Sequence, residues 1–144
     1  MKLAFIGGGN MAEAILSAIL DKGLARAEEI TVSDVLESKR ISLRQKYQVV
    51  VTDSNINAVK GKDIIVLAVK PQIFSEVALQ LKGQLQPDQL VISILAGKSI
   101  NSLSQGLAHY CIVRSMPNTP AQIAEGMTVW TATPQVLPNQ KAWA

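Results

Sequence analysis

The sequence predicts a single α/β domain built on a mainly parallel, doubly wound β-sheet. Short runs of β-branched and aliphatic residues alternate with stretches of helical periodicity from the first residues onward. Several of these runs are apolar on both faces, which is typical of strands that helices cover on both sides. With 144 residues, of which 48% are hydrophobic and 17% charged, the chain has enough apolar surface for one core and is too short for two full domains.

The apolar runs predict the strands, and the pattern stops near the end of the chain. Residues 132–144 contain Pro134 and Pro138 and too few periodic apolar positions to predict an element. We therefore expect a domain over residues 1–131 followed by a tail, which is either disordered or the start of a further helical domain. The expected strands are residues 3–6, 30–33, 49–51, 64–69, 90–95 and 111–114, with one more over 127–131.

Helices are predicted by spacing and by the residues at their ends. Apolar residues recur at helical spacing over residues 11–20, and Gly23 is placed to end that helix. Pro71 stands where a second helix begins, at a position that needs no amide hydrogen, and apolar residues follow at helical spacing over 73–81. Residues 100–107 carry a weaker stripe. Strands that alternate with helices in this way imply right-handed crossovers.

A glycine-rich turn follows the first expected strand. Gly7-Gly8-Gly9-Asn10-Met11-Ala12 has the form G-x-G-x-x-A at the start of the first helix. Gly7 allows the tight turn, Gly9 lets a pyrophosphate approach the backbone, and Ala12 lets the helix pack closely on the strand. The helix start offers free amide hydrogens and its positive end to the phosphates. A flexible turn is the alternative, but the flanking elements and an acidic residue about twenty positions later favour a Rossmann-type dinucleotide-binding domain.

That acidic residue, Asp34, leaves the nature of the dinucleotide open. An acid at the end of the second strand usually binds the ribose hydroxyls and favours NAD. Ser33, Lys39 and Arg40 favour the opposite, because a hydroxyl and two cations can bind a 2′-phosphate. Lys39 and Arg40 are equally consistent with a solvated helix face. We expect NADPH or NADH, with a preference for NADPH.

Ligands of open α/β sheets bind at the carboxyl ends of the strands, so the segments after the other strands are also candidates. Asn118, between two prolines, offers a donor and an acceptor, although an Asx turn is the alternative. Lys70 is either a phosphate contact or a solvated lysine. Asn55 either caps a helix that begins near Asp53 or reaches the adenosine end of a cofactor. The candidate cofactor-binding residues are Ile6, Gly7, Gly8, Gly9, Asn10, Met11, Ser33, Asp34, Asn55, Ala68, Val69, Lys70, Pro71, Ile94, Leu95, Ala96 and Asn118.

Composition excludes several other classes of function. The net charge is only +3, and the basic residues are mostly dispersed, so we expect no nucleic-acid partner. No apolar run approaches the roughly 18 residues that span a bilayer. Cys111 is the single cysteine and has no metal-ligand partner nearby, so we expect no metal site and a cytoplasmic protein. No nucleophile or carboxylate pair is identifiable, and the catalytic residues remain unknown.

Four segments together resemble the N-terminal domain of pyrroline-5-carboxylate reductases. The glycine turn is common to many dehydrogenases, but the later segments are more specific. They are Leu67-Ala68-Val69-Lys70-Pro71-Gln72, Ser93-Ile94-Leu95-Ala96-Gly97, and Arg114-Ser115-Met116-Pro117-Asn118-Thr119-Pro120-Ala121 followed by Glu125-Gly126-Met127-Thr128. The resemblance spans residues 2 to about 131.

The resemblance implies NAD(P)H-dependent reduction of 1-pyrroline-5-carboxylate to L-proline. It places residues 6–11 at the pyrophosphate, Asp34 at the adenosine ribose and Asn55 at the adenosine end. Residues 68–71 and 94–96 would line the nicotinamide half, with Asn118 beside them. The substrate would be a protonated imine, which already carries the electrophilic charge and needs mainly a well-placed hydride donor.

The sequence departs from this family where it ends. Family members continue into a helical domain that forms the dimer and supplies most substrate contacts. We therefore expect a complete cofactor site, an incomplete substrate site, and an oligomer only when the helical domain is present. The isolated chain should then bind cofactor with little or no reductase activity. The alternatives are a dinucleotide-binding module or relic without catalysis, and a domain of a β-hydroxyacid or 6-phosphogluconate type dehydrogenase.

Overall fold

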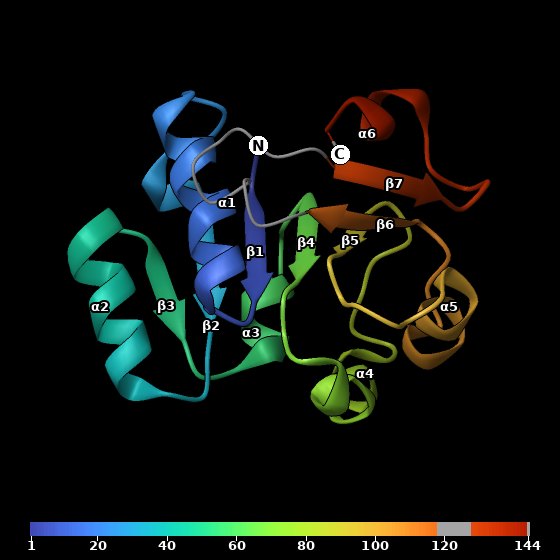
Figure 1. The fold of residues 1–144 in the computed structure, drawn as a ribbon, viewed down its shortest axis with the longest axis horizontal. Helices are drawn as coiled ribbons and strands as arrows, with labels where there is room; N and C mark the ends of the chain where they lie inside the picture. Colours follow the sequence, from blue (N-terminus) through green and yellow to red (C-terminus); the bar gives the residue numbers. More distant parts are fainter. Residues whose placement is uncertain (118–127, 144) are drawn as a thin grey trace.

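The computed structural model describes residues 1–117 and 128–143, and these form an α/β domain around one β-sheet. The sheet has seven strands in the order β3-β2-β1-β4-β5-β6-β7. All neighbouring strands are parallel except β6 and β7, which are antiparallel. In Figure 1 the sheet runs from β3 on the left to β7 on the right. The prediction of a doubly wound, mainly parallel Rossmann-type fold is confirmed.

The strands lie close to their predicted positions, but two end earlier and three end later. The fourth and fifth strands stop two residues before the predicted ends, because apolar residues continue past the last paired position. The third and the last are shifted by one residue, and the sixth, predicted over 111–114, continues to residue 117, where it pairs with the last strand. The strands are β1 (Leu3–Ile6), β2 (Ile30–Ser33), β3 (Val50–Thr52), β4 (Ile64–Leu67), β5 (Leu90–Ser93), β6 (Ile112–Pro117) and β7 (Thr128–Ala132).

Helices connect the parallel strands, and the three predicted from spacing are present. The second of them begins as a short 3-10 turn at Pro71 before it becomes α-helical. The helices are α1 (Asn10–Asp21), α2 (Glu37–Tyr47), α3 (Asn55–Val59), α4 (Phe74–Leu81), α5 (Ile100–Leu107) and α6 (Pro138–Trp143), with 3-10 turns η1 (Ala27–Glu29) and η2 (Pro71–Ile73). Among the described residues, no helix has the length and hydropathy required to cross a membrane.

Successive residues of each strand enter two different cores, one on each face of the sheet. Leu3 and Phe5 of β1 pack with residues of α1 and α2. Ala4 and Ile6 of the same strand pack with residues of α3, α4 and α5. This alternation follows from the two-residue period of a strand and explains why β1 is apolar throughout.

The order of the strands brings the predicted site residues to one edge. The last paired residue of β1, Ile6, is level with Ser33 of β2 on one side and with Leu67 of β4 on the other. Leu67 is in turn level with Ser93 of β5. In Figure 1 the arrowheads of β1 and β4 point to this lower edge. Because the connections from β1 and β4 leave in opposite directions, this is the switch point where ligands of such sheets bind.

Residues 132–144 contain a helix that the sequence does not predict. Helix α6 packs at the opposite edge of the sheet, at the top of Figure 1. Gln140 is 4% exposed; its amide donates to the Asp88 carbonyl oxygen at 2.9 Å, and its Oε1 accepts from Leu137 N and Cys111 Sγ. Val136 is buried in the core beside α1. The contacts with Asp88, Cys111 and the core are tertiary, so the two prolines and the short apolar pattern of the segment do not reveal them.

Candidate dinucleotide-binding site

Gly7 makes the turn between β1 and α1 possible. Its φ is +98°, a left-handed backbone conformation that residues other than glycine rarely adopt. A Cβ at this position would also lie 2.8 Å from the carbonyl oxygen of Ala68. The Gly7 amide donates to the Ser33 carbonyl oxygen at 2.8 Å, and the Ala68 amide donates to the Ile6 carbonyl oxygen at the same distance. The turn is therefore held between the ends of β2 and β4.

Gly8 ties this turn to the carboxylate that follows β2. Its amide donates to Oδ2 of Asp34 at 2.9 Å. Gly8 itself is buried, and a Cβ here would come within 2.8 Å of the Leu43 side chain of α2. A side chain at this position would therefore force the Leu43 side chain to move and would crowd Val32 and Asp34.

Gly9 differs from both neighbours because the space beside it is open. It is exposed, and a Cβ built on it would meet no atom of the described residues within 4 Å beyond its chain neighbours. It forms the N-cap of α1 without a side-chain cap, so the first amides of the helix point outward uncapped. The following residues Asn10 and Met11 are exposed and half-buried, respectively. An open helix N-terminus beside a glycine is well suited to a diphosphate, and the residues present fit this group.

Both carboxylate oxygens of Asp34 already accept hydrogen bonds from the backbone. Oδ2 accepts from Gly8 N and Oδ1 accepts from Leu36 N, each at 2.9 Å. Arg40 lies against the same loop, where its Nη1 donates to the carbonyl oxygens of Asp34 at 2.8 Å and Val35 at 3.2 Å. A guanidinium group is thus fixed at the end of β2, next to the turn that would carry the adenosine ribose.

Asn55 is held in a chain of side chains at the same edge. Buried Ser33 donates through its hydroxyl to Asn55 Oδ1, and Asn55 Nδ2 donates to Gln80 Oε1 of α4 at 2.7 Å. The cap of α3 is Ser54, whose hydroxyl oxygen accepts from Asn57 N. Of the two interpretations of Asn55, helix capping is therefore wrong. The sequence gives no signal for Gln80, which reaches Asn55 from a different helix.

The loops after β4 and β5 border the other side of the turn. Ala68 and Val69 are half-buried, Lys70 is exposed, and Pro71 begins η2. After β5, Ile94 N donates to the Leu67 carbonyl oxygen at 3.1 Å, which joins the two loops.

Leu95 is only 2% exposed, and its side chain belongs to the core that contains α4 and α5. Only the backbone of Leu95 can therefore line a site, whereas Ala96 is exposed. Asn118 lies outside the described residues, so its predicted place beside these loops stays a prediction.

Comparisons with known proteins agree with this arrangement. The model of the family described as NADP oxidoreductase, coenzyme F420-dependent, matches residues 2–97. The chain belongs to this family. It is also 41% identical over 144 residues to a pyrroline-5-carboxylate reductase of Synechocystis, covering 100% of this chain and 54% of the relative.

Two solved structures show the same likeness. A pyrroline-5-carboxylate reductase from Coxiella burnetii superposes with a TM-score of 0.93 at 34% identity, covering 99% of this chain and 53% of the other. Pyrroline carboxylate reductase of Plasmodium falciparum, solved with NADP bound, superposes with a TM-score of 0.86 at 28% identity. The match covers 99% of this chain and 52% of the other. The predicted resemblance is thus confirmed for the N-terminal half of these proteins. The chain spans about half the length of the relatives it matches.

A charged cluster near the turn was not predicted. Glu13, in the first turn of α1, accepts hydrogen bonds from Lys39, Lys46 and Tyr47 of α2, each at 3.0 Å. The bonds from Lys46 and Lys39 lower the pKa of Glu13 to about 2. Each partner is at least 26 positions away in the sequence, so no local motif points to the cluster.

The groups that could suggest other chemistry lie away from this edge. His109 and Cys111 precede β6 and therefore lie at the opposite edge of the sheet from the glycine turn. Burial lowers the pKa of His109 and raises the pKa of the Cys111 thiol. The His109 ring bonds the Gln89 carbonyl oxygen at 2.7 Å. Residues 1–117 and 128–143 contain no group of side chains that could hold a metal ion.

Proposed function

We propose that this chain binds NADP(H) and forms the cofactor half of an enzyme that reduces 1-pyrroline-5-carboxylate to L-proline. One observation carries the binding part of the proposal. The uncapped start of α1 stands behind a glycine turn that is closed to side chains at Gly7 and Gly8 and open at Gly9. This combination leaves room for an anion where backbone amides point to it.

Each part of the site has an assigned role in this proposal. Residues 6–11 hold the diphosphate through backbone amides. Asp34 orients the turn through Gly8 and faces the adenosine ribose, and Asn55 lies at the adenosine end. The backbone of residues 68–71 and 94–96 supports the nicotinamide ring from the neighbouring strands, with Asn118 beside it.

The preference for NADPH rests on the loop after β2. Each oxygen of Asp34 already accepts one backbone hydrogen bond, which leaves the carboxylate less free for two ribose hydroxyls than an unengaged acid would be. Among the described residues, Arg40 donates through Nη1 alone, which leaves the other donors of its guanidinium for a 2′-phosphate. Planar guanidinium groups bind phosphate in bidentate geometry.

The reaction part rests on the relatives that the chain matches. They are pyrroline-5-carboxylate reductases, of which the chain covers about half. The bound cofactor supplies a hydride, and the contribution of this chain is to hold the nicotinamide ring in a fixed place and exclude water from its face. The proposal assigns no substrate-contacting residue to this chain. A single free cysteine fits the reducing cytoplasm as the place where this reaction occurs.

A chimera tests the proposal. The matching N-terminal half of the Synechocystis relative is replaced by this chain, and NADPH oxidation is measured after addition of 1-pyrroline-5-carboxylate. We expect turnover within about tenfold of the parent enzyme, because the hydride donor would be held by equivalent loops.

Binding of NADPH without turnover in a folded chimera would contradict the reductase proposal and favour a dinucleotide-binding module. Failure of the chain to bind NADPH or NADH in a fluorescence titration would contradict both. The parent relative, assayed in parallel, controls for substrate and cofactor quality.

A further inference from the structure

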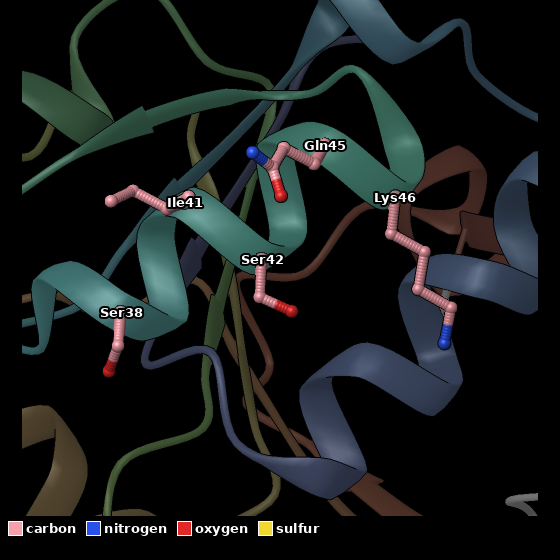
Figure 2. Close-up of a pocket in the computed structure, with 5 residues that line it drawn as sticks. All are labelled: Ser38, Ile41, Ser42, Gln45 and Lys46. Atoms are coloured by element: carbon pink, nitrogen blue, oxygen red, sulfur yellow. The ribbon is translucent and has the colours of Figure 1, made fainter.

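Glu13 lies close to the proposed cofactor site but binds none of its backbone turn through its side chain. Its amide donates to the Gly9 carbonyl oxygen at 2.9 Å, which places it one helical turn below the open glycine. Its carboxylate faces α2, and its side chain is 22% exposed. Figure 2 shows the Lys46 side chain extending from α2 toward α1. There its ammonium group pairs with Oε1 of Glu13 at 3.0 Å. Glu13 thus links the two helices that flank the proposed adenosine position.

The three donors are divided unequally between the two carboxylate oxygens. Oε1 accepts from Lys46 Nζ and from Tyr47 Oη, both in the last turn of α2. Over residues 1–117 and 128–143, Oε2 accepts from Lys39 Nζ only. If Lys39 leaves, Glu13 remains an ion paired with Lys46 and bonded to Tyr47. Departure of Lys39 therefore costs Glu13 one hydrogen bond and leaves its other two in place.

Lys39 also has the position of a phosphate ligand. It lies near the start of α2, one residue before Arg40, which is anchored to the loop after β2. Lys39 thus lies in the first turn of the helix that follows the proposed adenosine end, yet its ammonium group points to Glu13. Two cations are thus available at this end, of which Arg40 is anchored to the loop and Lys39 is held by an acid.

We propose that Glu13 sets the cofactor preference by holding Lys39 in an ion pair that a 2′-phosphate must replace. This inference rests on the proposed function and extends it to a residue outside the site. Glu13 acts through Lys39 and is a positioning residue. Because its pKa is lowered to about 2, the ion pair is present at every pH where the protein would work. The acid reduces the advantage of NADPH over NADH.

The experiment measures dissociation constants of the full chain for NADPH and NADH, and for the fragments 2′,5′-ADP and 5′-AMP. The variant Glu13→Gln removes the charge and keeps the size of the side chain. We expect the dissociation constants for NADPH and 2′,5′-ADP to fall about threefold to fivefold, as for loss of a competing, partly exposed ion pair. Those for NADH and 5′-AMP should not change, since neither carries the 2′-phosphate.

Two further variants separate release of Lys39 from a general change of charge. Lys39→Met in the Glu13→Gln background should abolish the gain, because the released cation is then absent. Lys46→Met is the matched control: it removes another cation from the same carboxylate, leaves the Lys39 pair in place, and should give no gain. Melting temperatures and circular dichroism check each fold, and Glu13→Ala repeats the test should Glu13→Gln unfold.

Several results would overturn the inference. A gain that persists after Lys39→Met would assign the effect to net charge alone. Equal changes for NADPH and NADH would make Glu13 a purely structural link between α1 and α2. A loss of NADPH affinity would mean that Glu13 presents Lys39 to the phosphate. Absence of binding of either dinucleotide to the unaltered chain would instead refute the proposed function itself.

Discussion

At the scale of single residues, the site depends on three glycines with three different requirements. Gly7 needs a left-handed backbone and contact with Ala68, whereas Gly8 needs the absence of a side chain against Leu43. A Cβ at Gly9 would meet no atom within 4 Å among the described residues outside its chain neighbours, so their folding does not require glycine there. A glycine without a structural reason beside an uncapped helix is best explained by a ligand that must come close to the backbone.

Arg40 is the residue whose replacement tests the cofactor preference. Arg40→Ala should raise the dissociation constant for NADPH about tenfold, because a charge-assisted bond to the 2′-phosphate is lost. The value for NADH should change less than about twofold. Fluorescence titrations of both cofactors measure the difference. Arg44→Ala is the matched control, since Arg44 is exposed one turn further along α2. Equal losses for NADPH and NADH would show that Arg40 only supports the loop.

Some of these residues were predictable and others were not, for physical reasons. The glycine turn and Asp34 are recognisable because their roles follow from local backbone geometry and fixed spacing. Asn55 was ambiguous because Ser54 and Asn55 are both good capping residues, and only the structure shows that Ser54 caps α3. The roles of Glu13 and Gln80 cannot be predicted from the sequence, since their partners come from other segments and no short motif encodes such contacts.

At the scale of elements, the sequence predicted which segments are strands better than where they end. Leu95 shows the reason: it is buried in the core although the ladder of β5 has already ended at Ser93. The sequence pattern stays apolar as long as residues are buried, whereas a strand ends where its hydrogen bonds to the neighbouring strand end. Helix α6 was missed for the converse reason, because its stability comes from Gln140 and Val136 docking on distant residues and not from local propensity.

Gln140 is the key contact of α6, and its replacement tests whether this helix belongs to the domain. Gln140→Ala should lower the free energy of unfolding by about 1–3 kcal/mol, because the buried Cys111 thiol and the part-buried backbone groups of Asp88 and Leu137 would lose their partner. Denaturant unfolding measures this. Asn139→Ala, an exposed position in the same helix, is the control and should change little. A loss below about 0.5 kcal/mol would support a domain that ends near residue 131.

At the scale of the whole molecule, the candidate cofactor site and the buried polar groups lie at opposite edges of the sheet. The edge at the carboxyl ends of β1, β2, β4 and β5 gathers the glycine turn, the Asp34–Arg40 loop and the backbone loops after β4 and β5. The opposite edge gathers His109, Cys111 and Gln140 in a buried hydrogen-bonded region. This separation predicts that variants at the second edge change stability without changing cofactor affinity.

The central claim is that a dinucleotide diphosphate lies against the backbone at Gly9. The most direct test is a fluorescence titration of the Gly9→Ala chain with NADPH. Within the described part of the chain, the added methyl group would meet no atom within 4 Å beyond its immediate neighbours, and an alanine N-cap should cost at most about 1 kcal/mol of unfolding free energy. We predict that the dissociation constant rises at least about tenfold while the chain stays folded, because the methyl group occupies the space of the phosphates. A dissociation constant within about twofold of that of the unaltered chain would contradict the claim.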